Sequence, residues 1–129
     1  MKSLLTFGAI CLAILSFGQA DYDQRLLAKY SKERLTKLIE KQPATIEYWT
    51  YYLDNSYTIV DGNATGKAIL ADEEVKIKNI EDFNILKLGI FMDGYATKYY
   101  SISGTNKYLA LKSTDQFVKE FSRTKKVNN

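Results

Sequence analysis

The hydrophobic pattern of this 129-residue chain changes its period near Tyr57, and this change constrains the fold more than any other feature. Before Tyr57, apolar residues recur every three to four positions, as on the buried stripe of an amphipathic helix. After it, short runs alternate between apolar and polar residues, as in half-buried strands. Helices followed by a run of strands are typical of an α+β fold rather than of alternating β-α-β units.

Capping signals predict the helices. Asp23 precedes a short apolar segment and Ser31 precedes a longer amphipathic one, and both residue types are preferred N-caps. Pro43 ends the second helix and suits the first turn of a third, which we expect over residues 44–54. Residues 113–116 have the spacing of a capping box, which predicts a short helix near the C-terminus.

The second part of the chain predicts an antiparallel β-meander of at least four strands. We expect the strands over residues 57–60, 75–78, 84–92, 95–102 and 107–112. The pair Asp93-Gly94 is a strong signal for a two-residue hairpin. The expected fold is therefore α+β, with N-terminal helices packed on the meander and a short C-terminal helix.

The first 20 residues have the three-part pattern of a cleavable export signal. Lys2 precedes an apolar run of 14 residues, and the small residues Gly18 and Ala20 occupy the positions that a signal peptidase reads. The run is shorter than the roughly 20 residues of a membrane-spanning helix. Cys11 lies in the middle of the run and lacks the small preceding residue of an acylation site, so we do not expect a lipid anchor.

After cleavage, we expect residues 21–122 to form one α+β domain and residues 123–129 a disordered basic tail. The protein is then periplasmic or secreted and has no membrane-spanning segment. This remaining chain contains no cysteine, because Cys11 lies in the signal. The whole chain has 18 Lys+Arg and 15 Asp+Glu, a balance that argues against nucleic acid as a partner.

The chain contains no histidine. This absence removes the usual general base at neutral pH and excludes triads of the Ser-His-Asp kind. It also removes the commonest ligand of zinc, copper and iron. We therefore predict no catalytic residue, no metal site and no cofactor, and we favour binding over catalysis while leaving enzymatic activity open.

Tyrosines of the third expected helix are the first candidate binding residues. Trp49 shares a face with apolar residues, whereas Tyr48 and Tyr51 fall on the opposite side. Exposed tyrosines offer a partner a large contact area with a polar tip. We predict a binding surface that comprises Tyr48, Tyr51 and Tyr52. The alternative is that these rings cover a sheet edge or the solvent side of the helix.

A second aromatic group lies on the expected strands. It comprises Tyr95, Tyr99, Tyr100 and Tyr108. Tyrosine is a favoured strand residue, so these rings need no further role. The alternative is a binding surface on whichever face of the sheet the helices leave uncovered.

Acidic residues gather at 72–74 and at 81–82. Carboxylates can bind calcium or act as an acid and base pair, and a hydrolase without histidine would use carboxylates such as Glu81 and Asp82. Neither group has the spacing of an EF-hand, and both lie in expected turns. Solvated turn residues are therefore the simpler interpretation.

The loop after the first expected strand carries two weaker motifs. Residues 61–68 are similar to a phosphate-binding loop, but three rather than four residues separate its glycines. Ala68 also stands where such a loop needs Ser or Thr. Residues 63–65 match the N-glycosylation sequon, which matters only in a eukaryotic secretory pathway.

The signal end at residues 17–20, the segment 48–55 and the run 57–61 resemble small exported proteins of gram-negative bacteria. The resemblance implies a periplasmic location and brings no assigned activity and no functional residues. Three interpretations remain open. They are a binding or interaction module for a partner protein or envelope component, a structural subunit of an envelope complex, and a carboxylate-based hydrolase. We favour the first.

Overall fold

The computed structural model describes residues 22–62 and 69–128, so the predicted export signal and the glycosylation sequon lie outside the described residues. The chain divides into two compact units, one that ends at Thr50 and one that begins at Tyr51. This boundary falls inside helix α3 (Pro43–Asn55).

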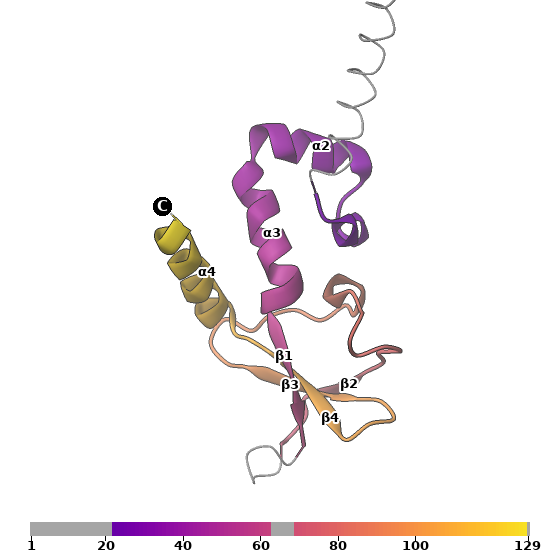
Figure 1. Cartoon of the computed structure of the whole chain (residues 1–129). Coiled ribbons are helices and arrows are strands. Elements are labelled where there is room, and N and C mark those ends of the chain that lie inside the picture. Colours follow the sequence, from indigo (N-terminus) through magenta and orange to yellow (C-terminus); the bar gives the residue numbers. More distant parts are fainter. Residues whose placement is uncertain (1–21, 63–68, 129) are drawn as a thin grey trace, which may run out of the picture. The chain divides into compact units, whose positions relative to one another are not determined.

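The first unit contains the short 3-10 helix η1 (Gln24–Ala28), helix α2 (Lys32–Lys41) and the start of α3 (Figure 1). Both predicted N-caps are confirmed. The carboxylate of Asp23 accepts a hydrogen bond from a backbone N–H of η1 at 2.9 Å, and the hydroxyl of Ser31 accepts one from α2 at 3.2 Å. These side chains satisfy N–H groups that the start of a helix leaves unpaired.

Apolar residues at helical spacing supply the buried side chains of the first unit. They are Leu26, Leu35, Leu38 and Ile46. Helix α3 begins at Pro43 as predicted, because the fixed φ of proline suits a first helical turn. The ammonium of Lys29 lies 4.2 Å from the centroid of the Trp49 ring, which links the end of η1 to α3 by a cation–π contact.

The second unit is built around a four-stranded sheet with the order β1-β4-β3-β2 (Figure 1). Its strands are β1 (Tyr57–Asp61), β2 (Glu73–Val75), β3 (Lys98–Ile102) and β4 (Lys107–Leu111). Strand β4 pairs antiparallel with β1 and β3, whereas β2 runs parallel to β3. The α+β class is therefore confirmed, but the prediction of a purely antiparallel meander is wrong because the sheet is mixed.

One face of this sheet belongs to the core of the second unit. Alternate residues of β3 and β4 are buried there: Tyr100, Ile102, Leu109 and Leu111. Phe117 of helix α4 (Thr114–Asn128) is fully buried as well. Its ring centroid lies 5.4 Å from that of Tyr51 and 5.6 Å from that of Tyr52, so aromatic packing joins α4 to the last turns of α3.

Helix α4 begins after Ser113, whose hydroxyl accepts a hydrogen bond from Gln116 N–H at 3.2 Å, which is one of the two hydrogen bonds of the predicted capping box. The side chain of Gln116 donates to Glu120 at 3.2 Å. The helix continues to Asn128, whereas we expected the ordered domain to end at residue 122. No helix in the described part of the chain is long and apolar enough to cross a membrane.

The predicted hairpin at Asp93 and Gly94 does not form. A type I′ turn needs positive φ at both central residues, and among the described residues only Gly89 and Gly104 have positive φ. The carboxylate of Asp93 instead accepts hydrogen bonds from two backbone N–H groups that follow it, at 2.9 and 3.2 Å. The carbonyls of Asp93 and Gly94 also accept hydrogen bonds from the first two N–H groups of α4.

The described residues 84–92 contain no strand, so this part of the predicted meander is also wrong. The segment begins with the 3-10 helix η2 (Ile85–Lys87), because the side chain of Asn84 accepts a hydrogen bond from an N–H of that helix at 3.0 Å. Gly89 then has a φ of 67°, a left-handed conformation that interrupts an extended strand. Strand β2, which ends at Val75 where we expected a strand to begin, occupies the place beside β3.

Candidate binding pocket

A pocket lies on the face of the sheet opposite to its core face. Its floor is Ala110 in the middle of β4, which is paired with Thr58 of β1 on one side and with Tyr99 of β3 on the other. Successive strand residues point to opposite faces, so these three side chains lie on the other face from Leu109 and Leu111. A small side chain between two larger ones leaves a hollow of about 320 Å³. This volume is at the lower end of the range for ligand pockets.

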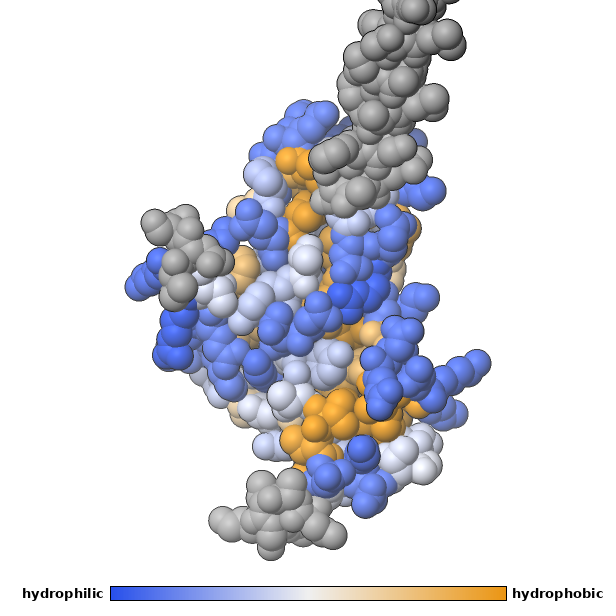
Figure 2. Space-filling view, in the orientation of Figure 1, coloured by the Kyte–Doolittle hydropathy of each residue, from blue (hydrophilic) through white to orange (hydrophobic). Residues whose placement is uncertain are grey.

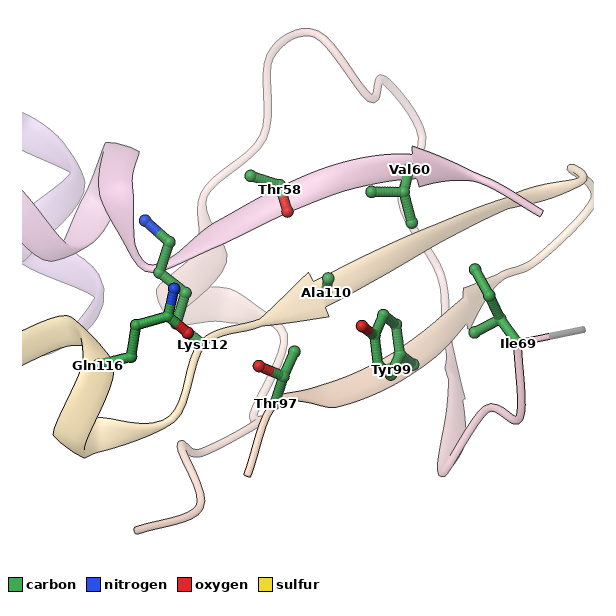
Figure 3. A pocket seen from close by; sticks show the side chains of 8 residues that line it. All are labelled: Thr58, Val60, Ile69, Thr97, Tyr99, Ala110, Lys112 and Gln116. Carbon is green, nitrogen blue, oxygen red and sulfur yellow. The ribbon is translucent and has the colours of Figure 1, made fainter. Parts of the chain in front are cut away.

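We call this hollow the sheet-face pocket. Besides Thr58, Tyr99 and Ala110, it is lined by Val60, Ile69, Thr97, Lys112 and Gln116 (Figure 3). Figure 3 shows the side chains of Lys112, Gln116 and Thr97 at the end nearer to α4, and those of Val60 and Ile69 at the other end. The pocket therefore has a polar end and an apolar end.

The charged side chain of the pocket, Lys112, is paired. Its Nζ lies 2.7 Å from Oε2 of Glu120, and Gln116 donates its amide N–H to the other carboxylate oxygen at 3.2 Å. The hydrogen bond from Lys112 lowers the pKa of Glu120 below its ordinary value, against an opposing effect of partial burial and with further help from Gln116. Glu120 is therefore ionised at neutral pH, and this carboxylate, which is not among the lining residues, neutralises the ammonium of Lys112 at the polar end of the pocket.

Three hydroxyl groups line the pocket, on Thr58, Thr97 and Tyr99. None of the three forms a hydrogen bond with another residue in the described ranges. Figure 3 shows the hydroxyl of Tyr99 on the side of its ring that faces Thr97. Since a hydroxyl both donates and accepts hydrogen bonds, the three hydroxyls can bind a ligand that has hydrogen-bond donors as well as acceptors.

None of the three tyrosines predicted to bind a partner is among the residues that line this pocket. Tyr48 belongs to the first unit, where its ring meets that of Trp49 edge-on at 5.1 Å and burial raises the pKa of its hydroxyl. Tyr51 and Tyr52 belong to the second unit and pack against Phe117, and Tyr52 is 5% exposed. These contacts give Tyr51 and Tyr52 a packing role within their own unit. A binding role for the three tyrosines stays a prediction.

The second group of tyrosines is divided between the two faces of the sheet and the loop before it. Tyr100 is buried on the core face, and Tyr99 lines the sheet-face pocket. Tyr108 is half-buried on β4, and Tyr95 is 95% exposed. Tyr99 is therefore the tyrosine of this group that supports the alternative of a binding surface on the sheet face opposite to the core.

The two acidic groups singled out in the sequence, residues 72–74 and 81–82, do not line the pocket. Glu81 and Asp82 are exposed, and their N–H groups donate to the side chain and the carbonyl of Asn79, which makes the predicted turn. Asp72 accepts a hydrogen bond from the N–H of Tyr99 at 3.1 Å and so continues the sheet beyond β2. Within residues 22–62 and 69–128, no group of three or more His, Cys, Asp or Glu side chains could hold a metal ion.

Apolar side chains are also exposed outside the pocket. Figure 2 shows hydrophobic surface over the strands of the second unit, next to hydrophilic residues. Leu70 is 86% exposed, and Phe91 is 77% exposed in the loop between η2 and β3 that also carries Tyr95. The hydrogen bonds that Asp93 accepts define the shape of this loop, so its two aromatic side chains are presented by a structured backbone.

The sequence reasoning missed Thr58, Ala110 and Lys112 as site residues. Two signals pointed to Thr58 and Ala110, and none pointed to Lys112. Thr58 alternates with apolar neighbours in β1, and Ala110 is a small residue between two leucines in β4. Neither signal shows that β1 and β4 are neighbours, because a meander in sequence order would place β1 beside β2.

No protein-family model, no curated protein and no solved structure matches this chain.

Proposed function

We propose that this protein is an exported binding module whose ligand occupies the sheet-face pocket. The observation that supports this most is the row of Thr58, Ala110 and Tyr99 across three paired strands. The row is rigid because strand backbones are held by the hydrogen bonds of the sheet, and rigid elements position a site more precisely than loops do. Export to the periplasm is part of the proposal and is supported by the signal pattern of residues 1–20.

Binding is favoured over catalysis by the chemistry of the lining. The pocket presents hydroxyl, amide and apolar groups, and the side chains that line it in the described ranges include no carboxylate, thiol or imidazole. Those are the groups that most often act as general base or as activated nucleophile. The nearest carboxylate partner, Glu120, is held by Lys112 and Gln116.

Filling the pocket tests the proposal. Ala110→Leu adds apolar volume to the floor, and Ala44→Leu makes the same change at an exposed position of α3 in the first unit. A library of small polar molecules is screened by protein-observed NMR. We expect hits to shift the amide signals of Thr58, Tyr99 and Ala110 in the wild type and in Ala44→Leu, and to be lost in Ala110→Leu. Hits that bind Ala110→Leu unchanged would contradict the proposal.

A structural subunit of an envelope complex is the second candidate. The exposed aromatic side chains of Phe91 and Tyr95 favour it, because large apolar groups on a structured loop are typical of protein interfaces. Such a subunit would leave its complex when both residues are replaced by serine, and Ala110→Leu would leave the complex intact. Size-exclusion chromatography of an extract from the native host measures both variants. The binding module predicts that neither replacement changes the elution volume.

A further inference from the structure

We infer that the ligand of the sheet-face pocket is a neutral, hydroxyl-rich group with a small apolar substituent, of which one N-acetylated sugar unit is the simplest example. This inference rests on the proposed function of the pocket and concerns the chemical class of its ligand. The charge, the arrangement and the size of the pocket carry it.

The charge of the pocket favours a neutral ligand. An anionic group would have to compete with Glu120 for Lys112, across an existing contact of 2.7 Å. A cationic group would approach the Lys112 ammonium in a pocket whose described lining offers it no carboxylate. A charged ligand of either sign therefore loses its hydration without gaining an ionic partner in the pocket. A neutral ligand leaves the Lys112–Glu120 pair intact.

The arrangement of the lining favours a ligand that is polar at one end and apolar at the other. The hydroxyls of Thr97 and Tyr99 and the amide of Gln116 supply donors and acceptors towards α4. Val60 and Ile69 supply an apolar surface at the far end. A sugar ring matches the first part with its hydroxyls, and the methyl of an acetamido group matches the second. The half-buried ring of Tyr99 offers a flat apolar face to the C–H groups of such a ring.

The size and position of the pocket argue against an extended peptide. The pocket lies over β1, β4 and β3, whose backbones are already paired with one another in the region of Thr58, Ala110 and Tyr99. A peptide that adds a strand needs an unpaired sheet edge, not a face. A volume of about 320 Å³ also suits a compact ligand.

Three related sugars test the chemical class. N-acetylglucosamine, glucose and glucosamine are titrated into the isotope-labelled protein, and amide shifts are followed by NMR. We expect N-acetylglucosamine to bind saturably and to shift the signals of Thr58, Tyr99 and Ala110. Glucose lacks the acetamido group and should bind about fourfold more weakly, by the burial of one methyl-sized group. Glucosamine, which is charged at neutral pH, should bind more weakly than glucose.

Matched variants locate the binding. Tyr99→Phe keeps the ring and removes one hydroxyl of the pocket, so it should weaken the binding of N-acetylglucosamine about fivefold. Tyr108→Phe makes the same change on β4 outside the lining and should leave binding unchanged. Ala110→Leu should abolish binding. Circular dichroism checks the fold of each variant, and the comparison of the two tyrosine variants stands even where Ala110→Leu does not fold.

The outcomes separate this inference from the proposed function. If N-acetylglucosamine does not bind but another small molecule binds in a way that Ala110→Leu abolishes, the sugar class is overturned and the pocket remains a binding site. If N-acetylglucosamine binds equally well to Tyr99→Phe and to the wild type, with shifts outside the pocket, the inference is overturned as well. If no compound binds in the pocket, both the inference and the proposed function fail.

Discussion

Two buried serines of the second unit have opposite surroundings. The hydroxyl of Ser113 accepts a hydrogen bond from Gln116 N–H at the start of α4. Ser56, between α3 and β1, is fully buried, and its hydroxyl has no hydrogen-bond partner among the described residues. A buried hydroxyl without a partner has lost its hydrogen bonds to water without replacing them, so it destabilises the fold.

The two serines should therefore respond in opposite directions to the same substitution. We expect Ser56→Ala to raise the free energy of unfolding by about 1 kcal/mol, because it removes an unsatisfied polar group. Ser113→Ala should lower it by about 1 kcal/mol, because it removes an N-cap. Urea denaturation followed by circular dichroism measures both. A loss of stability in Ser56→Ala would show that its hydroxyl is hydrogen-bonded after all.

Single residues with local effects were predictable from the sequence. Asp23, Ser31 and Ser113 accept hydrogen bonds within the first turn of their own helices, so their roles follow from neighbouring positions in the chain. The role of Ala110 was not predictable, because it depends on the residues that two other strands place beside it.

At the scale of elements, the loop between η2 and β3 depends on one carboxylate. Hydrogen bonds from Tyr95 N–H and Ala96 N–H lower the pKa of Asp93 from the ordinary 3.8. A lowered pKa in the folded state means that the ionised carboxylate favours folding. This contribution is complete above pH 3.8 and is lost as the pH falls through the lower pKa of the folded state.

Asp93→Asn tests this contribution. Asparagine keeps an acceptor oxygen for the two N–H groups but does not titrate. Between about pH 5 and about pH 2.5, the free energy of unfolding should fall less in Asp93→Asn than in the wild type. Urea denaturation at each pH measures the difference, and Asp82→Asn, at an exposed turn position, is the control for the loss of one charge. Equal slopes for Asp93→Asn and the wild type would contradict the assignment.

The strands show where local pattern and tertiary structure disagree. Residues 84–92 have the apolar content of a strand, yet Asn84 starts a 3-10 helix and Gly89 adopts a left-handed conformation. Asp93 and Gly94 resemble a hairpin turn, but their carbonyls are hydrogen-bonded to the start of α4. The contacts of Asp93 and Gly94 come from residues about twenty positions away, which a window of sequence does not contain.

At the scale of the whole molecule, the export signal stays a prediction with a direct test. When the full chain is expressed in a gram-negative host, we expect a periplasmic protein whose first residue is Asp21. Replacing Ala20 by tyrosine should block cleavage, because signal peptidase needs a small residue at this position. Mass spectrometry of the periplasmic fraction measures the mature N-terminus. A protein that stays in the cytoplasm and retains residues 1–20 would contradict the prediction.

The division into two compact units also belongs to this scale. We expected one domain over residues 21–122, and the structure places a boundary between Thr50 and Tyr51 inside a continuous helix. The predicted tyrosine surface crosses this boundary, since Tyr48 belongs to the first unit and Tyr51 to the second. The residues that line the sheet-face pocket, in contrast, all belong to the second unit.

The sequence by itself determined the start of η1, α2, α3 and α4, the strands β1 and β4, and the α+β class, because those signals act between residues a few positions apart. Only the tertiary structure decided the order of the strands and the parallel direction of β2. Strand pairing joins distant segments, and it is selected by which faces can be buried together. The sheet-face pocket belongs to the second kind of feature, since Thr58, Tyr99 and Ala110 become neighbours only when β4 lies between β1 and β3.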